Sequence, residues 1–93
     1  MLMLYYFRWA GTPKELHEYV GRVKGVSDVV EGANFMGVFA PTSEWNAVIL
    51  LETTSMDKGQ EVYVTLLKKY GPNPNDTLAK IEILATFDEL GYT

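Results

Sequence analysis

Few side chains in this sequence are suited to acid–base or nucleophilic chemistry. The chain has 93 residues, no cysteine and a single histidine, His17. Without cysteine, thiol nucleophiles, disulfides and zinc–thiolate sites are excluded. One histidine cannot build a usual zinc site, although a magnesium site made only of carboxylates stays open. We therefore predict no metal centre and no cofactor.

His17 is the natural general base, because histidine titrates near neutral pH. Its position argues for a surface residue instead. At about 100° per residue, it lies roughly 120° from the centre of the apolar stripe of a predicted helix. It shares that side of the helix with Lys24 and Asp28. We expect a solvated histidine, so the catalytic residues, if there are any, stay unknown.

Arg8 and two glutamates are the charged candidates for a binding site. Arg8 belongs to the apolar segment 2–9, where a buried charge must be paired or must meet an anionic ligand. An ion pair with Glu52 or Glu82 at the end of a sheet is the favoured interpretation, and a carboxylate-binding arginine is the alternative. The two glutamates are also a possible acid–base pair, but nothing in the sequence fixes their spacing.

Tyrosine and tryptophan side chains could line a ligand pocket, because such pockets are mostly apolar with a few polar groups. Packing of the helical tyrosines against a sheet is the simpler interpretation. Gln60, beside Gly59 on the buried side of a predicted helix, would need a polar partner there. The predicted ligand-binding residues are Tyr6, Arg8, Glu52, Gln60 and Tyr63.

Two helices and four strands would position these side chains. Thr12, Pro13 and Glu15 predict a capped helix start, and Gly32 predicts its end, with a break near Gly25 left open. A second helix begins after residue 54 or 55 and ends at Gly71. Its apolar stripe is predicted as Met56, Gly59, Tyr63, Leu66, Leu67 and Tyr70. The predicted strands are 2–9, 34–40, 45–53 and 78–87, with a hairpin tip at 41–44.

The order strand, helix, strand, strand, helix, strand predicts a ferredoxin-like α+β fold, that is, a βαββαβ chain. Such a fold has an antiparallel four-stranded sheet with two helices on one face. Its first and third strands are central, and here these two are the most apolar. The predicted edge strand 78–87 carries Lys80 and Glu82, as expected for an edge.

The first predicted strand is apolar on both faces. Met3, Tyr5, Phe7 and Trp9 point to one side, and Leu2, Leu4 and Tyr6 to the other. Helices cover only one face, so the other would expose an apolar patch of the kind that marks an interface. A second copy stacked sheet to sheet would bury that patch. We predict a homodimer, with Phe7 on the outward face.

Composition limits the remaining partners. The net charge is −4, and no basic cluster exceeds the pair Lys68-Lys69, so nucleic acid is not expected as a partner. No apolar run is long enough to span a bilayer, and the N-terminus lacks the features of a secretion signal. We expect a single domain, residues 1–93, in the cytoplasm and without a membrane partner.

The segment GVFAPTSEWNAVILLETTS, taken with the element order, resembles the dimeric α+β barrel superfamily. The resemblance covers nearly the whole chain and is strongest to uncharacterised stand-alone domains. These are related to small monooxygenases and to the ligand-binding domains of leucine-responsive regulators. It implies a barrel across a dimer and a ligand cavity between helices and sheet. No functional residue of these families carries over to this chain.

Three functions follow as expectations. The first is a homodimeric domain that binds a small apolar or aromatic molecule in a cavity between helices and sheet. The second is a cofactor-independent enzyme of monooxygenase or isomerase type. The third is a purely structural dimerisation domain. A cavity with polar groups pointing into it favours the first two, and a filled interior favours the third.

Overall fold

The computed structural model describes residues 1–41 and 45–92, apart from the side chain of Leu78. The predicted hairpin tip falls mostly at 42–44, outside the described residues. The elements in chain order are β1 (Leu2–Trp9), α1 (Pro13–Val29), β2 (Ala33–Phe39), β3 (Ala47–Thr53), α2 (Met56–Tyr70) and β4 (Asp76–Leu84).

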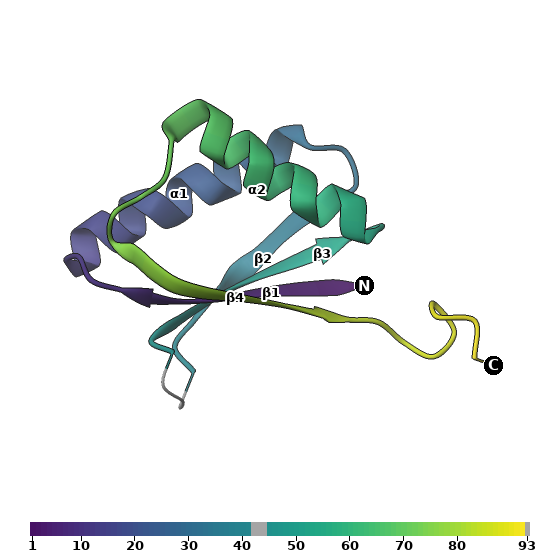
Figure 1. Ribbon diagram of the computed structural model, residues 1–93. Coiled ribbons are helices and arrows are strands. Elements are labelled where there is room, and N and C mark those ends of the chain that lie inside the picture. Colours follow the sequence, from purple (N-terminus) through teal and green to yellow (C-terminus); the bar gives the residue numbers. More distant parts are fainter. Residues whose placement is uncertain (42–44, 93) are drawn as a thin grey trace.

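The four strands form one antiparallel sheet in the order β2-β3-β1-β4. Both helices lie on the same face of this sheet, and in the described part of the chain the opposite face carries no helix (Figure 1). The predicted ferredoxin-like arrangement is therefore confirmed. The largest shift in bounds is in β4, which begins two residues earlier and ends three residues earlier than predicted.

The helix ends follow the capping chemistry in the sequence. The Glu15 amide donates to Thr12 Oγ1 (3.2 Å), and the Thr12 amide donates to Glu15 Oε1 (3.1 Å). At the end of α2, Gly71 takes a φ of 73°, which favours glycine. The possible break at Gly25 does not occur, and α1 runs on to Val29. Its buried stripe holds it to the sheet on both sides of that glycine.

The sheet face under the helices carries the core. Met3, Tyr5, Phe7 and Trp9 alternate with outward residues along β1 and are all buried. Phe7 is 0% exposed, so its predicted outward position is wrong. Alternation separates the residues of a strand into two sets, but it does not say which set the helices cover. Leu2, Leu4 and Tyr6 form the outward set and are half-buried.

The apolar stripe of α2 differs in part from the predicted one. Gly59, Val62 and Leu66 are its buried residues, and Val62 was not among those predicted. Met56 and Tyr70 lie at the two ends of α2 and are exposed. The middle of the helix therefore makes the main contact with the sheet. Within the described residues, neither helix has the length and apolar character needed to cross a bilayer.

Candidate functional site

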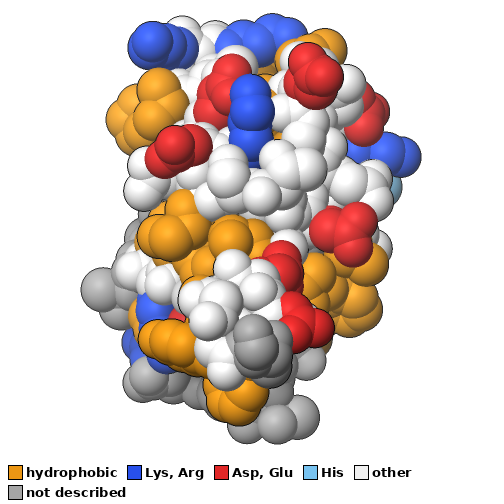
Figure 2. Space-filling model, turned by 90° about the vertical axis from the view of Figure 1, so that its right-hand side faces the viewer, with side chains coloured by type: hydrophobic (Ala, Val, Ile, Leu, Met, Phe, Trp, Pro, Cys, Tyr) orange, Lys and Arg blue, Asp and Glu red, His pale blue; other side chains and the backbone are white. Residues whose placement is uncertain are grey.

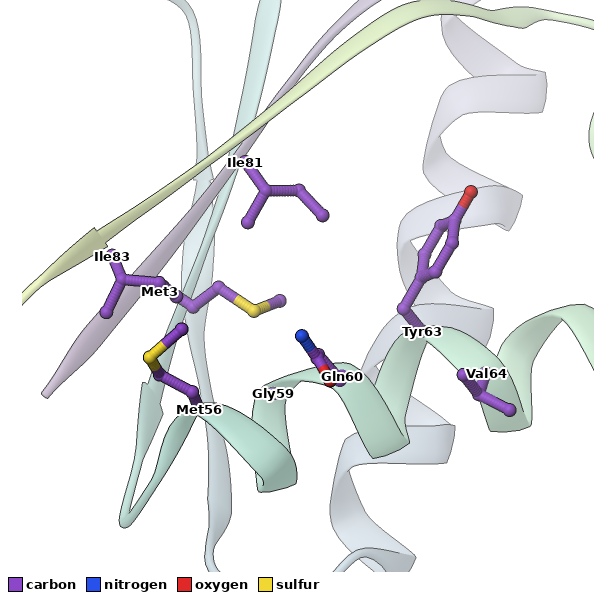
Figure 3. Close-up of a pocket in the computed structure, with 8 residues that line it drawn as sticks. All are labelled: Met3, Met56, Gly59, Gln60, Tyr63, Val64, Ile81 and Ile83. Atoms are coloured by element: carbon purple, nitrogen blue, oxygen red, sulfur yellow. The ribbon is translucent and has the colours of Figure 1, made fainter.

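A cavity of about 470 Å³ lies between α2 and the strands β1 and β4 (Figure 3). Its lining is mostly aliphatic and thioether side chains, with one amide and one phenol. The lining residues are Met3, Met56, Gly59, Gln60, Tyr63, Val64, Ile81 and Ile83. Figure 2, which looks onto the right-hand side of Figure 1, shows apolar side chains in a band below the charged side chains of the upper part.

Gly59 gives the cavity part of its shape. A Cβ atom at this position would lie 2.5 Å from the sulfur of Met3, which is closer than real contacts allow. The glycine therefore lets the Met3 side chain reach across from β1 to the surface of α2 (Figure 3). A thioether chain at this wall is flexible and polarizable, so it can adapt to a bound molecule.

A smaller cavity of about 100 Å³ also lies in the interface between α2 and β4, which is called the seam below. Tyr63 lines both cavities. The strands β1 and β4 contribute inward-pointing residues to both cavities. Met3 and Ile81 line the larger cavity, and Tyr5 and Ala79 line the smaller one. The seam thus has an apolar part and a part rich in tyrosine.

Asp76 is the charged group of the smaller cavity. The hydroxyls of Tyr5 and Tyr19 both donate to Asp76 Oδ2, at 2.6 and 2.7 Å. The other oxygen, Oδ1, is buried and has no hydrogen-bond partner among the described residues. An unsatisfied buried acceptor costs about 1–3 kcal/mol. Because Asp76 lines the smaller cavity, its unsatisfied oxygen is a candidate for contact with a ligand.

A bulge between β1 and β4 aims Asp76 at the helices. Tyr6 pairs with Lys80, but Trp9 pairs with Asp76, so the register shifts by one residue in between. An unshifted register would place Thr77 opposite Trp9 and would turn Asp76 to the outer face. Bulges re-aim side chains in this way and are frequent beside functional sites. The carboxylate thus owes its position to a local irregularity.

The aromatic neighbours hold this cluster in place. The Trp9 ring stacks on Tyr19 at 5.3 Å between centroids, and its indole Nε1 donates to the Thr12 carbonyl (2.9 Å). Burial, followed by the hydrogen bond to the Asp76 carboxylate, raises the pKa of both Tyr5 and Tyr19. Both phenols therefore keep their protons and remain donors to Asp76 at neutral pH.

The five predicted ligand-binding residues do not come together. Gln60 and Tyr63 line the larger cavity, and Gln60 is exposed, so water can satisfy its amide. Tyr6, Arg8 and Glu52 lie on the outer face of the sheet, and Glu52 also lines an open hollow of about 520 Å³ together with Gly32 and Thr54. The sequence predicts an outward Phe7, but Phe7 is in the core, so Tyr6 and Arg8 of the opposite β1 set lie on the outer face. Their role in binding stays a prediction.

The predicted partners of Arg8 are distributed along the outer face. Glu52 pairs with Leu2, whereas Arg8 lies near the other end of β1, opposite Thr77. Glu82 forms an ion pair with Lys80 (3.1 Å), which lowers the pKa of its carboxyl. An Arg8–Glu52 pair and a Glu52–Glu82 acid–base pair therefore have no support in the register.

Tyr6 belongs to a small aromatic and charged group on this outer face. Its ring lies 6.4 Å from that of Trp45, and Lys80 Nζ lies 5.5 Å from the centre of the Tyr6 ring. Partial desolvation and the neighbouring Glu82 raise the pKa of the Tyr6 phenol. The lysine and the aromatic rings cover part of the apolar surface of the sheet.

His17 is exposed, as its helical position predicts. In the described part of the chain, no three histidine or carboxylate side chains lie together in a way that could hold a metal ion. Sequence reasoning missed Tyr5 and Asp76 as site residues. Asp76 stood in a segment interpreted as a loop, and the only signal for it was an acidic residue two positions before the predicted strand 78–87.

Comparison with protein-family models finds no match for this chain, and neither does a search of curated proteins. The function must therefore be argued from the geometry of the cavities along α2 and of the outer sheet face.

Proposed function

We propose that this chain is a ligand-binding domain that holds a small apolar or aromatic molecule in the larger cavity. The observation that carries this proposal is the cavity of about 470 Å³ between α2 and the β1–β4 edge. Ligand sites commonly measure about 300–1,000 Å³ and are lined by apolar groups with a few polar ones. A purely structural dimerisation domain has no need of such a space, so the cavity argues against that alternative.

The lining of the cavity suits an apolar ligand. Apolar surface moved out of water stabilises a complex by about 25 cal/mol per Å². Met3 and Met56 offer adaptable contacts, and Ile81 and Ile83 offer branched ones from the edge strand. Gln60 and Tyr63 supply the polar groups that would orient the molecule.

The cavity is tested with a neutral aromatic probe, phenylbutanol, followed by NMR shifts of the lining residues. Ile81→Trp should fill the cavity and abolish these shifts. Leu84→Trp is the matched control, because it changes a similarly exposed residue of β4 (52% against 48%) that does not line the cavity. Binding of the probe to neither wild type nor control, or equally to Ile81→Trp, would contradict the proposal.

A homodimer is the second part of the proposal. Leu2, Leu4, Tyr6 and Leu50 give the outer face an apolar centre that no helix covers. Arg8 lies towards one end of this face and Glu52 towards the other. A second copy in the inverted orientation would place unlike charges together and would bury the apolar centre. Sheet-on-sheet packing of this kind is the architecture of a dimeric α+β barrel.

Light scattering tests the dimer. The wild-type mass should be twice 10.5 kDa. Leu4→Glu should give monomers, because it buries an unpaired charge at the interface. Val29→Glu should stay dimeric, because Val29 is 78% exposed on α1, away from the outer sheet face. A monomeric wild type would rule out this part of the proposal.

The alternative is a cofactor-independent enzyme of monooxygenase or isomerase type. The hydrogen-bonded group of Tyr5, Tyr19 and Asp76 favours it, because a carboxylate beside a cavity can accept a proton. Recovery of an unchanged bound molecule after incubation in air would support binding alone, and a converted product would support the enzyme. A cytoplasmic location stays a prediction.

A further inference from the structure

The smaller cavity carries a negative charge that has no positive partner among the described residues. Asp76 Oδ2 accepts from two phenols, and Oδ1 is buried and unpaired. Among the described residues, none of the ion pairs includes Asp76. Arg22, which lines a neighbouring cavity together with Tyr19, lies over the ring of Tyr70 at 4.8 Å. Phenols stabilise a carboxylate, but they do not neutralise it.

The walls of this cavity also favour a cation. Tyr5, Tyr19 and Tyr63 all line it, and the rings of Tyr5 and Tyr63 lie 5.8 Å apart. The faces of aromatic rings attract ammonium groups, most strongly where water is excluded. An anionic ligand would be repelled by the Asp76 charge. A neutral hydroxyl could donate to Oδ1 but would bring no charge.

We propose that the ligand is an aromatic or aliphatic amine, and that Asp76 binds its ammonium group while the apolar body fills the larger cavity. This inference rests on the proposed function, because it assigns a ligand class to the same seam. Tyr63 lies where the two parts of such a ligand would join. The volume of about 100 Å³ beside Asp76 is sufficient for an ammonium head group, and about 470 Å³ remains for the body.

The experiment compares three probes of one length by isothermal titration calorimetry at neutral pH: phenylbutylamine, phenylbutanol and phenylbutyrate. The amine should bind about tenfold or more tightly than the alcohol, as a charge-assisted hydrogen bond predicts, and the carboxylate should bind weakest. Asp76→Asn should remove the advantage of the amine, so that the amine and the alcohol bind the variant with about equal affinity. Asp28→Asn, an exposed change of the same charge on α1, should preserve the advantage.

The outcomes separate the inference from the proposed function. If the alcohol binds and the amine is no better, or if Asp76→Asn keeps the amine's advantage, the inference is wrong and the apolar cavity still stands. If none of the probes binds, both the proposed function and the inference fail. If Asp76→Asn does not fold, the inference is still tested by comparing the affinities of the wild type for the amine and the alcohol.

Discussion

The two faces of the sheet are built from the same strands but are covered differently. On the helix side, Phe7, Ile49 and Leu51 are almost completely buried. On the outer side, Leu4, Tyr6 and Leu50 are half-buried and have no helix over them. Since both faces are apolar, the composition of a strand does not determine which face becomes the core. The apolar stripes of α1 and α2 determine it, because the helices can pack on one face only.

The faces also treat charge differently. The charged side chains of the outer face stay in contact with solvent. The ion pair between Lys80 and Glu82 is an example, because both of its side chains are exposed. The helix face takes in one carboxylate, Asp76, and stabilises it with two phenols. A charge on the helix side therefore needs specific hydrogen-bond partners to offset its desolvation. Charges on the outer side remain in water and contribute little to stability. Four predictions test this difference, from the largest effect to the smallest.

Phe7→Ala should lower the free energy of unfolding by about 3–5 kcal/mol, because it opens a cavity in the core. Tyr6→Ala, the neighbouring change on the outer face, should cost much less at concentrations where the chain is monomeric. Urea denaturation at low protein concentration measures both. Equal losses would mean that the two faces are equally buried in solution.

Tyr19→Phe should destabilise the chain by about 1.5–3 kcal/mol, because it removes a hydrogen bond to a charged, partly buried acceptor. Tyr6→Phe on the outer face should have a far smaller effect. Guanidinium denaturation of the pair gives the comparison. A loss at Tyr19 no larger than that at Tyr6 would show that the contact with Asp76 is not important for stability.

Alkaline pH should unfold the chain through Tyr5 and Tyr19. Both phenols have a raised pKa in the folded state, whereas the unfolded value is 10.0. The stability that they contribute is fully present below about pH 10 and is lost as the pH rises further, because the unfolded chain then releases protons that the folded chain keeps. Phenolate absorbance should therefore rise together with the loss of helical circular dichroism. Titration of all six tyrosines before unfolding would contradict this.

Glu82→Gln should leave the urea midpoint nearly unchanged, because the pair with Lys80 is exposed and screened by solvent. Added salt should also change the urea midpoint of the wild type very little. A marked loss that depends on protein concentration would instead place Glu82 in the dimer interface.

The fold was predictable because its signals are local. The capping box at Thr12, the stop at Gly71 and the order of the elements needed no tertiary information. The site was not predictable for the opposite reason. The side of the sheet on which Phe7 or Tyr6 would lie depends on packing. The direction of Asp76 depends on a one-residue shift between β1 and β4 that no local pattern indicates.

The contact between Met3 and Gly59 has a consequence for how this chain could change over evolution. The depth of the larger cavity is set by an unbranched thioether lying against a position without a side chain. One added methyl group at position 59 would push the sulfur aside, whereas a shorter residue at position 3 would deepen the space. The size of the molecule that the proposed site would accept could thus be changed by single substitutions at either position, with the carboxylate on β4 and the capped ends of both helices left as they are.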